Sequence, residues 1–429
     1  MRSRFALVVV PLALLISRDA RAGNVLKVGP GQAYSGIQPA IDAASDGDVV
    51  LVYGGPGPYA GFVVPDRSLA IVGEPGTNAA VLGEIHVEGQ GARRTVVVAS
   101  LVAHASDAFQ NALQLKQSLA AVRLQDCTLA GEDLTIPQDA GVAANIGFCS
   151  DVVFTRCTLR GGNGLQSASN CWAMGRGGDA CFARSSMVEI YGSTLSGGPG
   201  AGDFCEEHLD GLHGGQAFET PEGVLFASGC QFQGGAGGAG GDGDSFEYGG
   251  NGGNGGDGIR LGSTPPPSLG MPQALLHSCT LLGGAAGMPG FGGLGSGSPG
   301  SAGLPIDTFS GSASTSTDPA RRMEGPSLAR EAESVTLVFH GAPGDEVYLK
   351  NDRVFSPPSA PGWMNRLMLA QIHLGTIPAS GTLSWTFTVG EIGGAIQSRT
   401  VLTRPTFVDA NGTEFQGNSF AFVAIDRTL

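Results

Sequence analysis

The chain contains little charge, and almost none of it comes from lysine. Only 14% of the 429 residues are Asp, Glu, Lys or Arg, against about 25% in typical proteins. Lysine occurs three times, and the 38 acidic residues outnumber the 24 basic ones, which gives a net charge of −14. A surface that binds DNA or RNA needs clustered positive charge, so we expect no nucleic-acid partner.

Glycine is abundant, with 71 residues, but it has no strict three-residue period along the chain as a whole. The absence of that period excludes a collagen triple helix. Hydrophobic residues make up 41% of the sequence and recur periodically, which excludes a wholly disordered chain.

No apolar run is long enough to cross a bilayer comfortably, and the longest lies at the N-terminus. Arg2 and Arg4 precede an apolar stretch over residues 5–16, and Ala20-Arg21-Ala22 follows it. This order is typical of a secretory signal peptide over residues 1–22, with an N-terminal membrane anchor as the alternative. We therefore expect a secreted protein, in the extracellular space or at the cell surface.

None of the eight cysteines is in a C-x-x-C motif, which argues against a zinc or thioredoxin-like site. All eight follow residue 22, so an exported chain can form disulfides. We expect Cys127, Cys157, Cys230 and Cys279 to be buried as small hydrophobic residues. The better disulfide candidates are the remaining four: Cys149, Cys171, Cys181 and Cys205.

Five similar segments organise residues 110–285. Each has alternating apolar residues, then Cys or Ser, then an apolar residue two positions later, and the segments are 122–129, 152–159, 188–195, 225–232 and 274–281. A second apolar unit precedes each segment, at Leu113, Val142, Cys181, Leu212 and Ile259. Strand-like alternation with a slip of one residue predicts a corner between two short strands, and hence a parallel β-solenoid.

The N-terminal part of the mature chain resembles a known fold family. It contains an amphipathic helix over residues 34–44 with Ser35 as the expected N-cap, a Gly-Asp turn at 46–48, and strands at 49–53 and 69–73. These elements and the repeats resemble the right-handed parallel β-helix proteins of the pectin-lyase-like group, over residues 24–305. The resemblance implies the fold but not the function, because this fold hosts lyases, hydrolases, esterases and adhesins.

The fold class expected is therefore all-β: a right-handed parallel β-helix with a short N-terminal cap helix, followed by a small C-terminal β-sandwich. The β-helix should cover residues 23–307, with glycine-rich loops over 234–303, where 26 of 70 residues are glycine. A Ser/Thr/Pro-rich stretch over 308–332 predicts a linker. Alternating apolar residues over 333–429 predict the sandwich domain.

One acidic cluster is a candidate catalytic site: Asp203, Glu206, Glu207, Asp210 and His213. Carboxylates with an imidazole can bind a divalent cation or support acid–base hydrolysis. The alternative is a solvated loop.

A second candidate lies at residues 252–260, which match a calcium nonapeptide, with Asp242 and Asp257 as possible ligands. Tandem copies nine residues apart are missing, so an ordinary glycine loop is the alternative to calcium as a cofactor.

No motif of the enzyme families with this fold is intact. Residues 125–129 and 202–205 contain only fragments of pectinesterase-like motifs, and residues 210–213 only a fragment of a galacturonase-like one. We therefore expect a binding protein whose partner is a polysaccharide or a cell-envelope component. The alternatives are a polysaccharide lyase, glycoside hydrolase or pectinesterase-like enzyme on acidic polysaccharide, or a structural, passenger-type surface protein.

Overall fold

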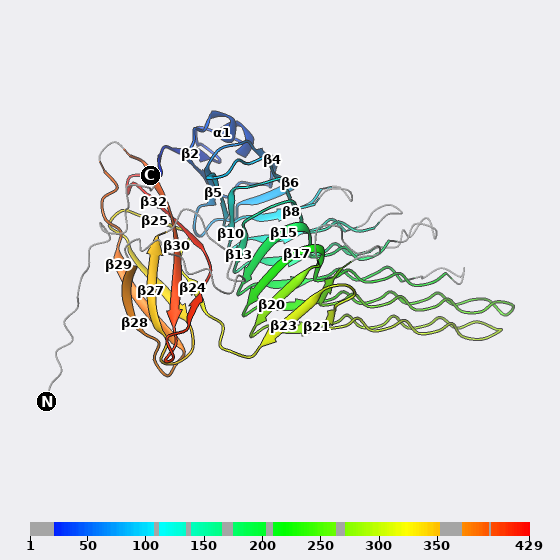
Figure 1. Ribbon diagram of the computed structural model, residues 1–429. Coiled ribbons are helices and arrows are strands. Elements are labelled where there is room, and N and C mark those ends of the chain that lie inside the picture. The colour runs from blue at the N-terminus through cyan, green and yellow to red at the C-terminus, as the bar shows by residue number, and fades with distance from the viewer. Residues whose placement is uncertain are drawn as a thin grey trace.

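A parallel β-helix and a C-terminal β-sandwich make up the molecule (Figure 1). The structure is a computed structural model that describes residues 21–106, 111–133, 139–164, 175–202, 209–262, 271–351, 371–393 and 396–429. None of the helices in these described ranges has the length and apolar character that crossing a bilayer requires.

The β-helix contains 22 strands, from β2 (Val25–Val28) to β23 (Ser312–Ser316), and their parallel pairings divide them into three faces. The first face consists of β2, β3 (Val49–Val52), β5 (Leu69–Gly73), β7 (Thr95–Ala99), β10 (Ala121–Gln125), β13 (Val152–Thr155), the second halves of β15 (Cys181–Tyr191) and β17 (Phe218–Ser228), β20 (Gln273–His277) and β23. The second face begins with the first residues of β4 (Tyr59–Val64) and β6 (Ala80–Glu88). It continues through β8 (Val102–His104), β11 (Thr128–Ala130), β14 (Thr158–Arg160), β16 (Thr194–Ser196), β18 (Gln231–Gln233) and β21 (Thr280–Leu282). The third face consists of β4 (Tyr59–Val64), β6 (Ala80–Glu88), β9 (Leu113–Lys116), β12 (Ala144–Gly147), the first halves of β15 and β17, β19 (Ile259–Leu261) and β22 (Ile306–Asp307).

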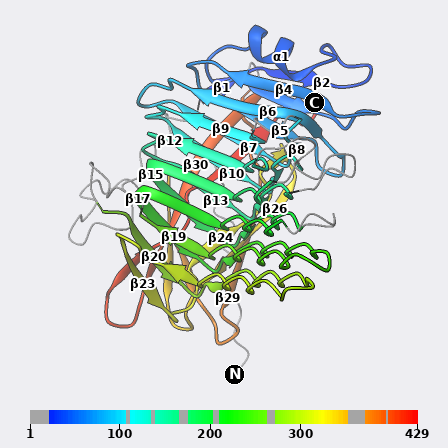
Figure 2. The ribbon, with the colours of Figure 1, turned by 90° about the vertical axis from the view of Figure 1, so that its right-hand side faces the viewer.

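The strand register confirms the five repeated segments. Their first residues are paired through successive coils: Val122 with Val152, then Val188, Leu225 and Ala274. Two of the preceding units were placed wrongly, because Ala144 and Phe218, not Val142 and Leu212, occupy the third-face register with Leu113 and Cys181. Val142 and Leu212 are apolar, as a strand residue at this position would be, but they lie in the loops that precede β12 and β17. Figure 2 shows the coils stacked from the blue N-terminal end to the yellow-green terminal coil.

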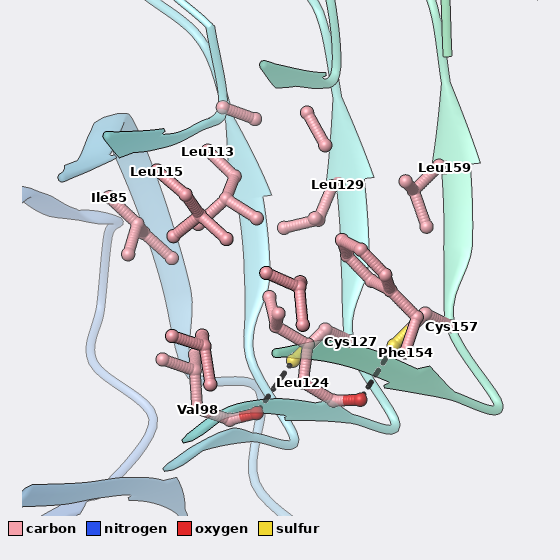
Figure 3. Close-up of a cluster of buried hydrophobic side chains, with 14 of the residues drawn as sticks. Ile85, Val98, Leu113, Leu115, Leu124, Cys127, Leu129, Phe154, Cys157 and Leu159 are labelled. Atoms are coloured by element: carbon pink, nitrogen blue, oxygen red, sulfur yellow. Dashed lines mark hydrogen bonds between the residues drawn. The ribbon is translucent and has the colours of Figure 1, made fainter. Parts of the chain in front are cut away.

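The inward side chains form one continuous core in which cysteine replaces a small apolar residue (Figure 3). Cys127 and Cys157 are buried, and their thiols donate to the carbonyl oxygens of Val98 and Leu124, each at 3.4 Å. The expectation of buried, free cysteines is confirmed for these two and for Cys230, while Cys279 is half-buried and free.

The disulfide prediction is wrong where the structure tests it. Cys149 and Cys181 are both free and buried in the β-helix core, where they pack as small hydrophobic residues. Cys171 and Cys205 lie outside the described residues.

Helix α1 (Ile37–Ala43) covers the N-terminal end of the core and buries Ile37, Ala40 and Ile41. It is shorter than predicted, because the N-cap is Gly36 and no side chain caps the helix, so Ser35 does not have the expected role. Residues 1–20 lie outside the described residues, so the signal peptide remains a prediction. The short strand β1 (Arg21–Gly23) pairs with β30 (Ser398–Val408) of the sandwich.

The sandwich packs two sheets around a second core. The larger sheet contains β1, β25 (Leu328–Arg330), β27 (Glu346–Asn351), β28 (Gln371–Thr376), β30 (Ser398–Val408), β31 (Glu414–Gln416) and β32 (Phe420–Ile425). The smaller sheet contains β24 (Arg322–Glu324), β26 (Ser334–His340) and β29 (Thr382–Thr388). The stretch 308–332 is not the expected free linker, because β23 extends the β-helix while β24 and β25 belong to the sandwich.

The sandwich is fixed to the first face of the β-helix. A shared apolar cluster joins residues such as Leu51 and Val97 to Leu402 and Val423. A buried ion pair reinforces the contact, since the Arg404 guanidinium donates to both carboxylate oxygens of Glu189, at 2.9 and 3.1 Å. This contact leaves the second face free to carry loops on the side away from the sandwich (Figure 1).

Candidate functional site

Long glycine-rich loops leave the second face after four successive strands, and they project side by side (Figure 1). We call them the glycine loop stack, described over residues 161–164, 175–178, 197–202, 209–215, 234–258 and 283–305. In each loop an outgoing half leads away from the β-helix and a return half leads back to the third face.

Backbone hydrogen bonds in the stack repeat every three residues. In the third loop, Gly250, Gly253 and Gly256 donate to Gly241, Gly238 and Gly235 of the same loop, each at 2.8 Å. In the fourth loop, Gly284, Gly287 and Gly290 donate to Gly256, Gly253 and Gly250 of the third. Three residues is the repeat of the polyproline II helix, which has no hydrogen bonds of its own and leaves all of them for its neighbours.

Space explains why these positions are glycine. A Cβ built on Gly253 would lie 2.1 Å from the carbonyl oxygen of Leu212, and one on Gly252 would lie 2.1 Å from that of Gly287. The same crowding makes glycine obligatory at the axis of collagen. The three-residue period that the whole chain lacks is therefore present locally, with two glycines in every three residues over 234–242 and 249–257 of the third loop.

The fourth loop is the last layer, and proline occupies part of its outer side. Gly240 and Gly252 of the third loop donate to Met288 and Ser298 of the fourth. The equivalent positions of the fourth loop are Pro289 and Pro299, because Gly290 and Gly300 take the places of Gly241 and Gly253 in the hydrogen-bond pattern. Proline has no N–H, so these positions offer no donor to a further layer.

The described members of the predicted acidic site lie along the return edge of the stack. Asp210 Oδ1 accepts the backbone N–H of Asn251 at 2.7 Å, and His213 Nδ1 accepts that of Asn254 at 2.9 Å. Burial lowers the pKa of His213, with Arg176 adding to the effect, which favours the neutral imidazole that accepts this bond. Both side chains therefore hold adjacent loops together. The other three, Asp203, Glu206 and Glu207, lie outside the described residues.

The two calcium candidates have the same role as Asp210. Asp242 Oδ1 accepts the N–H of Phe291 and Asp257 Oδ1 accepts that of Leu304, both at 2.7 Å. Within the described ranges no three His, Cys, Asp or Glu side chains lie close enough together to hold a metal ion. The repeat of two glycines in three residues, which the packing of the stack requires here, accounts for the nonapeptide-like pattern at 252–260.

A group of carboxylates that the sequence analysis missed lies where the stack joins the third face. Asp179 Oδ1 accepts the N–H of Gln216 at 2.6 Å. Burial, with a smaller contribution from the charge of Glu219, raises the pKa of Asp179 to about 7. Burial also raises the pKa of Glu219 and of Asp257, against the opposing charge of Arg260. Only the coil register, which brings residues about 40 positions apart together, could have identified this group.

The far end of the stack exposes large apolar side chains, also missed from the sequence. Phe246 is 80% exposed, Phe291 67% and Tyr248 62%, and Met288 and Leu294 are also exposed. We call these five residues the tip surface. The backbone beneath them is bonded between layers, because Gly243 N–H donates to Phe291 at 2.8 Å and Leu294 N–H donates to Glu247 at 3.0 Å.

The strand pairings thus define a protein that combines a parallel β-helix with a β-sandwich and a projecting loop stack. No protein-family model matches the chain, and no curated protein matches it. Among solved structures, it is similar to the full-length tailspike protein 2 of the Escherichia coli O157:H7 bacteriophage CAB120, with 12% identity and a TM-score of 0.30. The match covers 93% of this chain and 64% of the tailspike chain, so the chain spans less than two thirds of the tailspike's length. The fold assignment rests on the strand pairings, and membership of the pectin-lyase-like group remains a prediction.

Proposed function

We propose that the protein is an exported, non-catalytic binding protein that recognises glycans at a surface through the tip of its glycine loop stack. The observation that carries the proposal is the exposed apolar tip surface on hydrogen-bonded, closely packed loops. Contiguous exposed apolar side chains on a soluble protein mark interaction sites. Ordering a loop before binding lowers the entropy lost on association.

The predicted catalytic and calcium-binding candidates within the described residues favour this interpretation. Asp210, His213, Asp242 and Asp257 each use a side-chain atom to accept a backbone N–H of a neighbouring loop. A residue committed to such a bond has less freedom to accept a proton from a substrate or to bind a metal.

The proposal is tested by applying the full chain to an array of immobilised polysaccharides and measuring both retention and released products. Retention without new reducing ends or unsaturated products is the expected result. If the chain is retained on no polysaccharide, the proposed function is wrong.

An enzyme acting on polysaccharide is the second candidate, and one observation favours it. A carboxyl group whose pKa is about 7, such as Asp179, is suited to general acid catalysis near neutral pH. The same assay distinguishes the two candidates: product release that Asp179→Asn abolishes, and that Asp210→Asn leaves intact, would establish the enzyme and place its site at the base of the stack.

A further inference from the structure

A cavity lies between the two sheets of the C-terminal sandwich, and its walls are almost entirely apolar. Leu337 of β26 and Phe387 of β29 line it from the smaller sheet. From the larger sheet it is lined by three successive cross-strand pairs of β30 and β32: Arg399 with Ala424, Val401 with Phe422, and Thr403 with Phe420. Residues of a strand advance by about 3.3 Å each, so the residues that line the cavity along β30 span about 13 Å.

The inner end of the cavity suits a small apolar group. The volume of the cavity is about 40 Å³, and one water molecule needs roughly 10–15 Å³, so about three groups of the size of a water or a methylene fit. Thr403 is the polar residue at this end, and its Oγ1 already donates to the carbonyl oxygen of Phe420 at 3.4 Å. An enclosed water needs about two to four polar partners, so this space favours carbon over water.

The outer end of the cavity holds an arginine whose hydrogen bonding is incomplete. Arg399 is half-buried, and its Nε is buried without a hydrogen-bond partner among the described residues. The three buried arginines of the described chain each have a carboxylate: Arg123 has Asp151, Arg321 has Asp345 and Arg404 has Glu189. No described carboxylate forms such a pair with Arg399. A buried donor without an acceptor destabilises the fold, so this group calls for an acceptor from outside the chain.

The guanidinium of Arg399 favours a planar anion with a single charge. The Nε–H and a neighbouring Nη–H of a guanidinium match the two oxygens of a carboxylate, which gives a bidentate pair. Arg399 is the only charged residue among the described residues that line the cavity, so a second negative charge on the ligand would meet no second cation. Such a charge would also be repelled by Glu331, which accepts the N–H of the lining residue Ile392 at 2.6 Å. A monocarboxylate therefore fits this end of the cavity better than a phosphate or an amine.

We propose that the sandwich cavity binds a short-chain monocarboxylate, with the alkyl chain between Val401 and Phe422 and the carboxylate paired with the Arg399 guanidinium. This is a second binding site, in the sandwich on the side of the β-helix away from the glycine loop stack (Figure 1). The inference does not depend on the proposed function of the tip surface.

The test uses the full chain labelled with nitrogen-15 at arginine, so that each arginine Nε–H gives an NMR signal. The signal of Arg399 is identified as the one lost in Arg399→Gln. We expect butanoate to shift this signal and to leave that of Arg427, an exposed arginine of the same domain, unchanged. Butanamide has nearly the same shape without the charge, and it should bind at least tenfold more weakly because a charge-assisted pair is lost.

The length of the alkyl chain tests the size of the cavity. Each methylene that enters the cavity should tighten binding about fourfold. Affinity should therefore rise from acetate to butanoate and level off beyond hexanoate, because the cavity has room for about three such groups. Glucuronate carries the same carboxylate on a polar ring and should not bind measurably, since its hydroxyl groups would lose water without gaining partners.

Two kinds of variant separate the parts of the site. Arg399→Gln should weaken butanoate binding at least tenfold and leave butanamide binding unchanged, whereas Arg427→Gln, the matched control, should change neither. Ala424→Leu should abolish the binding of both ligands by filling the cavity. Val401→Phe fills the same space from β30 and takes the place of Ala424→Leu if urea unfolding shows that the latter does not fold.

Each contrary result has a distinct meaning. Binding of butanamide or butylammonium as tight as that of butanoate would refute the pairing with Arg399. Butanoate binding that survives in a folded cavity-filling variant, or that Arg427→Gln weakens as much as Arg399→Gln, would refute the location. No shift of the Arg399 signal with any carboxylate would overturn the inference, and the proposed function of the tip surface would stand.

Discussion

Gly253→Ala tests the packing of the glycine loop stack at one of its crowded positions. The new Cβ would lie 2.1 Å from the carbonyl oxygen of Leu212, whereas real Cβ contacts stay beyond 3.0 Å. The second and third loops must therefore separate locally by about 1 Å. The surrounding atoms are backbone, so no flexible side chain can move aside.

The cost follows from the hydrogen bonds that this separation stretches. Three bonds of 2.8 Å meet at the site: Gly253 to Gly238, Gly238 to Leu212, and Gly287 to Gly253. At about 1 kcal/mol each their loss costs about 3 kcal/mol. Alanine also lowers the conformational entropy of the unfolded chain, which stabilises the folded state by about 0.7 kcal/mol. We expect the stack to be less stable by about 2 kcal/mol.

Hydrogen exchange measured by mass spectrometry is the appropriate assay, because the stack can open without unfolding the β-helix. A loss of 2 kcal/mol predicts exchange about 30-fold faster in peptides that contain Gly238 and Gly287. Gly57→Ala is the control, since a Cβ there meets no atom within 4 Å. Exchange within twofold of the wild type in both peptides would refute the packing argument.

Three further predictions follow from the same structure. Pro289→Gly combined with Pro299→Gly adds two N–H donors to the outer layer, so we expect concentration-dependent self-association in sedimentation velocity, and a strictly monomeric variant would contradict the edge argument. The pKa of Asp179 is about 7 in the folded chain and about 3.9 in the unfolded chain, so the stability of the wild type falls as pH rises from 4 to 7. Asp179→Asn should therefore stabilise the chain at pH 8 by up to about 4 kcal/mol. An equal effect of the substitution at pH 4 and pH 8 in urea unfolding would contradict this. Glu189→Gln places the buried Arg404 guanidinium beside a neutral amide and should cost about 3 kcal/mol or more in urea unfolding, whereas a loss below 1 kcal/mol would show that the pair does little to hold the domains together.

The β-helix was predictable from the sequence because its coils obey a local rule. Inward residues alternate on each short strand, and the small residue at the corner recurs as Cys127, Cys157 and Cys230, so adjacent coils could be aligned without knowing the loops. The third face was harder to predict, since loops of different length separate it from the second. Apolar residues of those loops can imitate a strand residue, so Ala144 and Phe218 were missed while Leu113 and Ile259 were found.

The glycine loop stack could not be predicted in the same way, because backbone hydrogen bonds and not side chains define it. Asp210, His213 and Asp257 were singled out for their chemistry, but they accept backbone N–H groups of residues 41 to 47 positions further along the chain. Such long-range backbone partners appear only once the coils are stacked. The tip surface was missed for a related reason: exposed phenylalanines between glycines have no periodic pattern of their own.

The glycine pattern nevertheless encodes the order of the layers. In the third loop, which has neighbours on both sides, glycine occupies two of every three positions in residues 234–242 and 249–257, and a Cβ at positions such as Gly252 and Gly253 would meet a backbone carbonyl. A terminal loop needs glycine only on its inner side, and the fourth loop has that pattern, with Gly284, Gly287 and Gly290 inward and Ala286 and Pro289 at the outer positions. The change from two glycines in three to one in three therefore marks the last layer of the stack. The exposed rings are concentrated at the end of this layer and of the loop beside it, where a ligand can approach from the open side without disturbing the hydrogen bonds beneath.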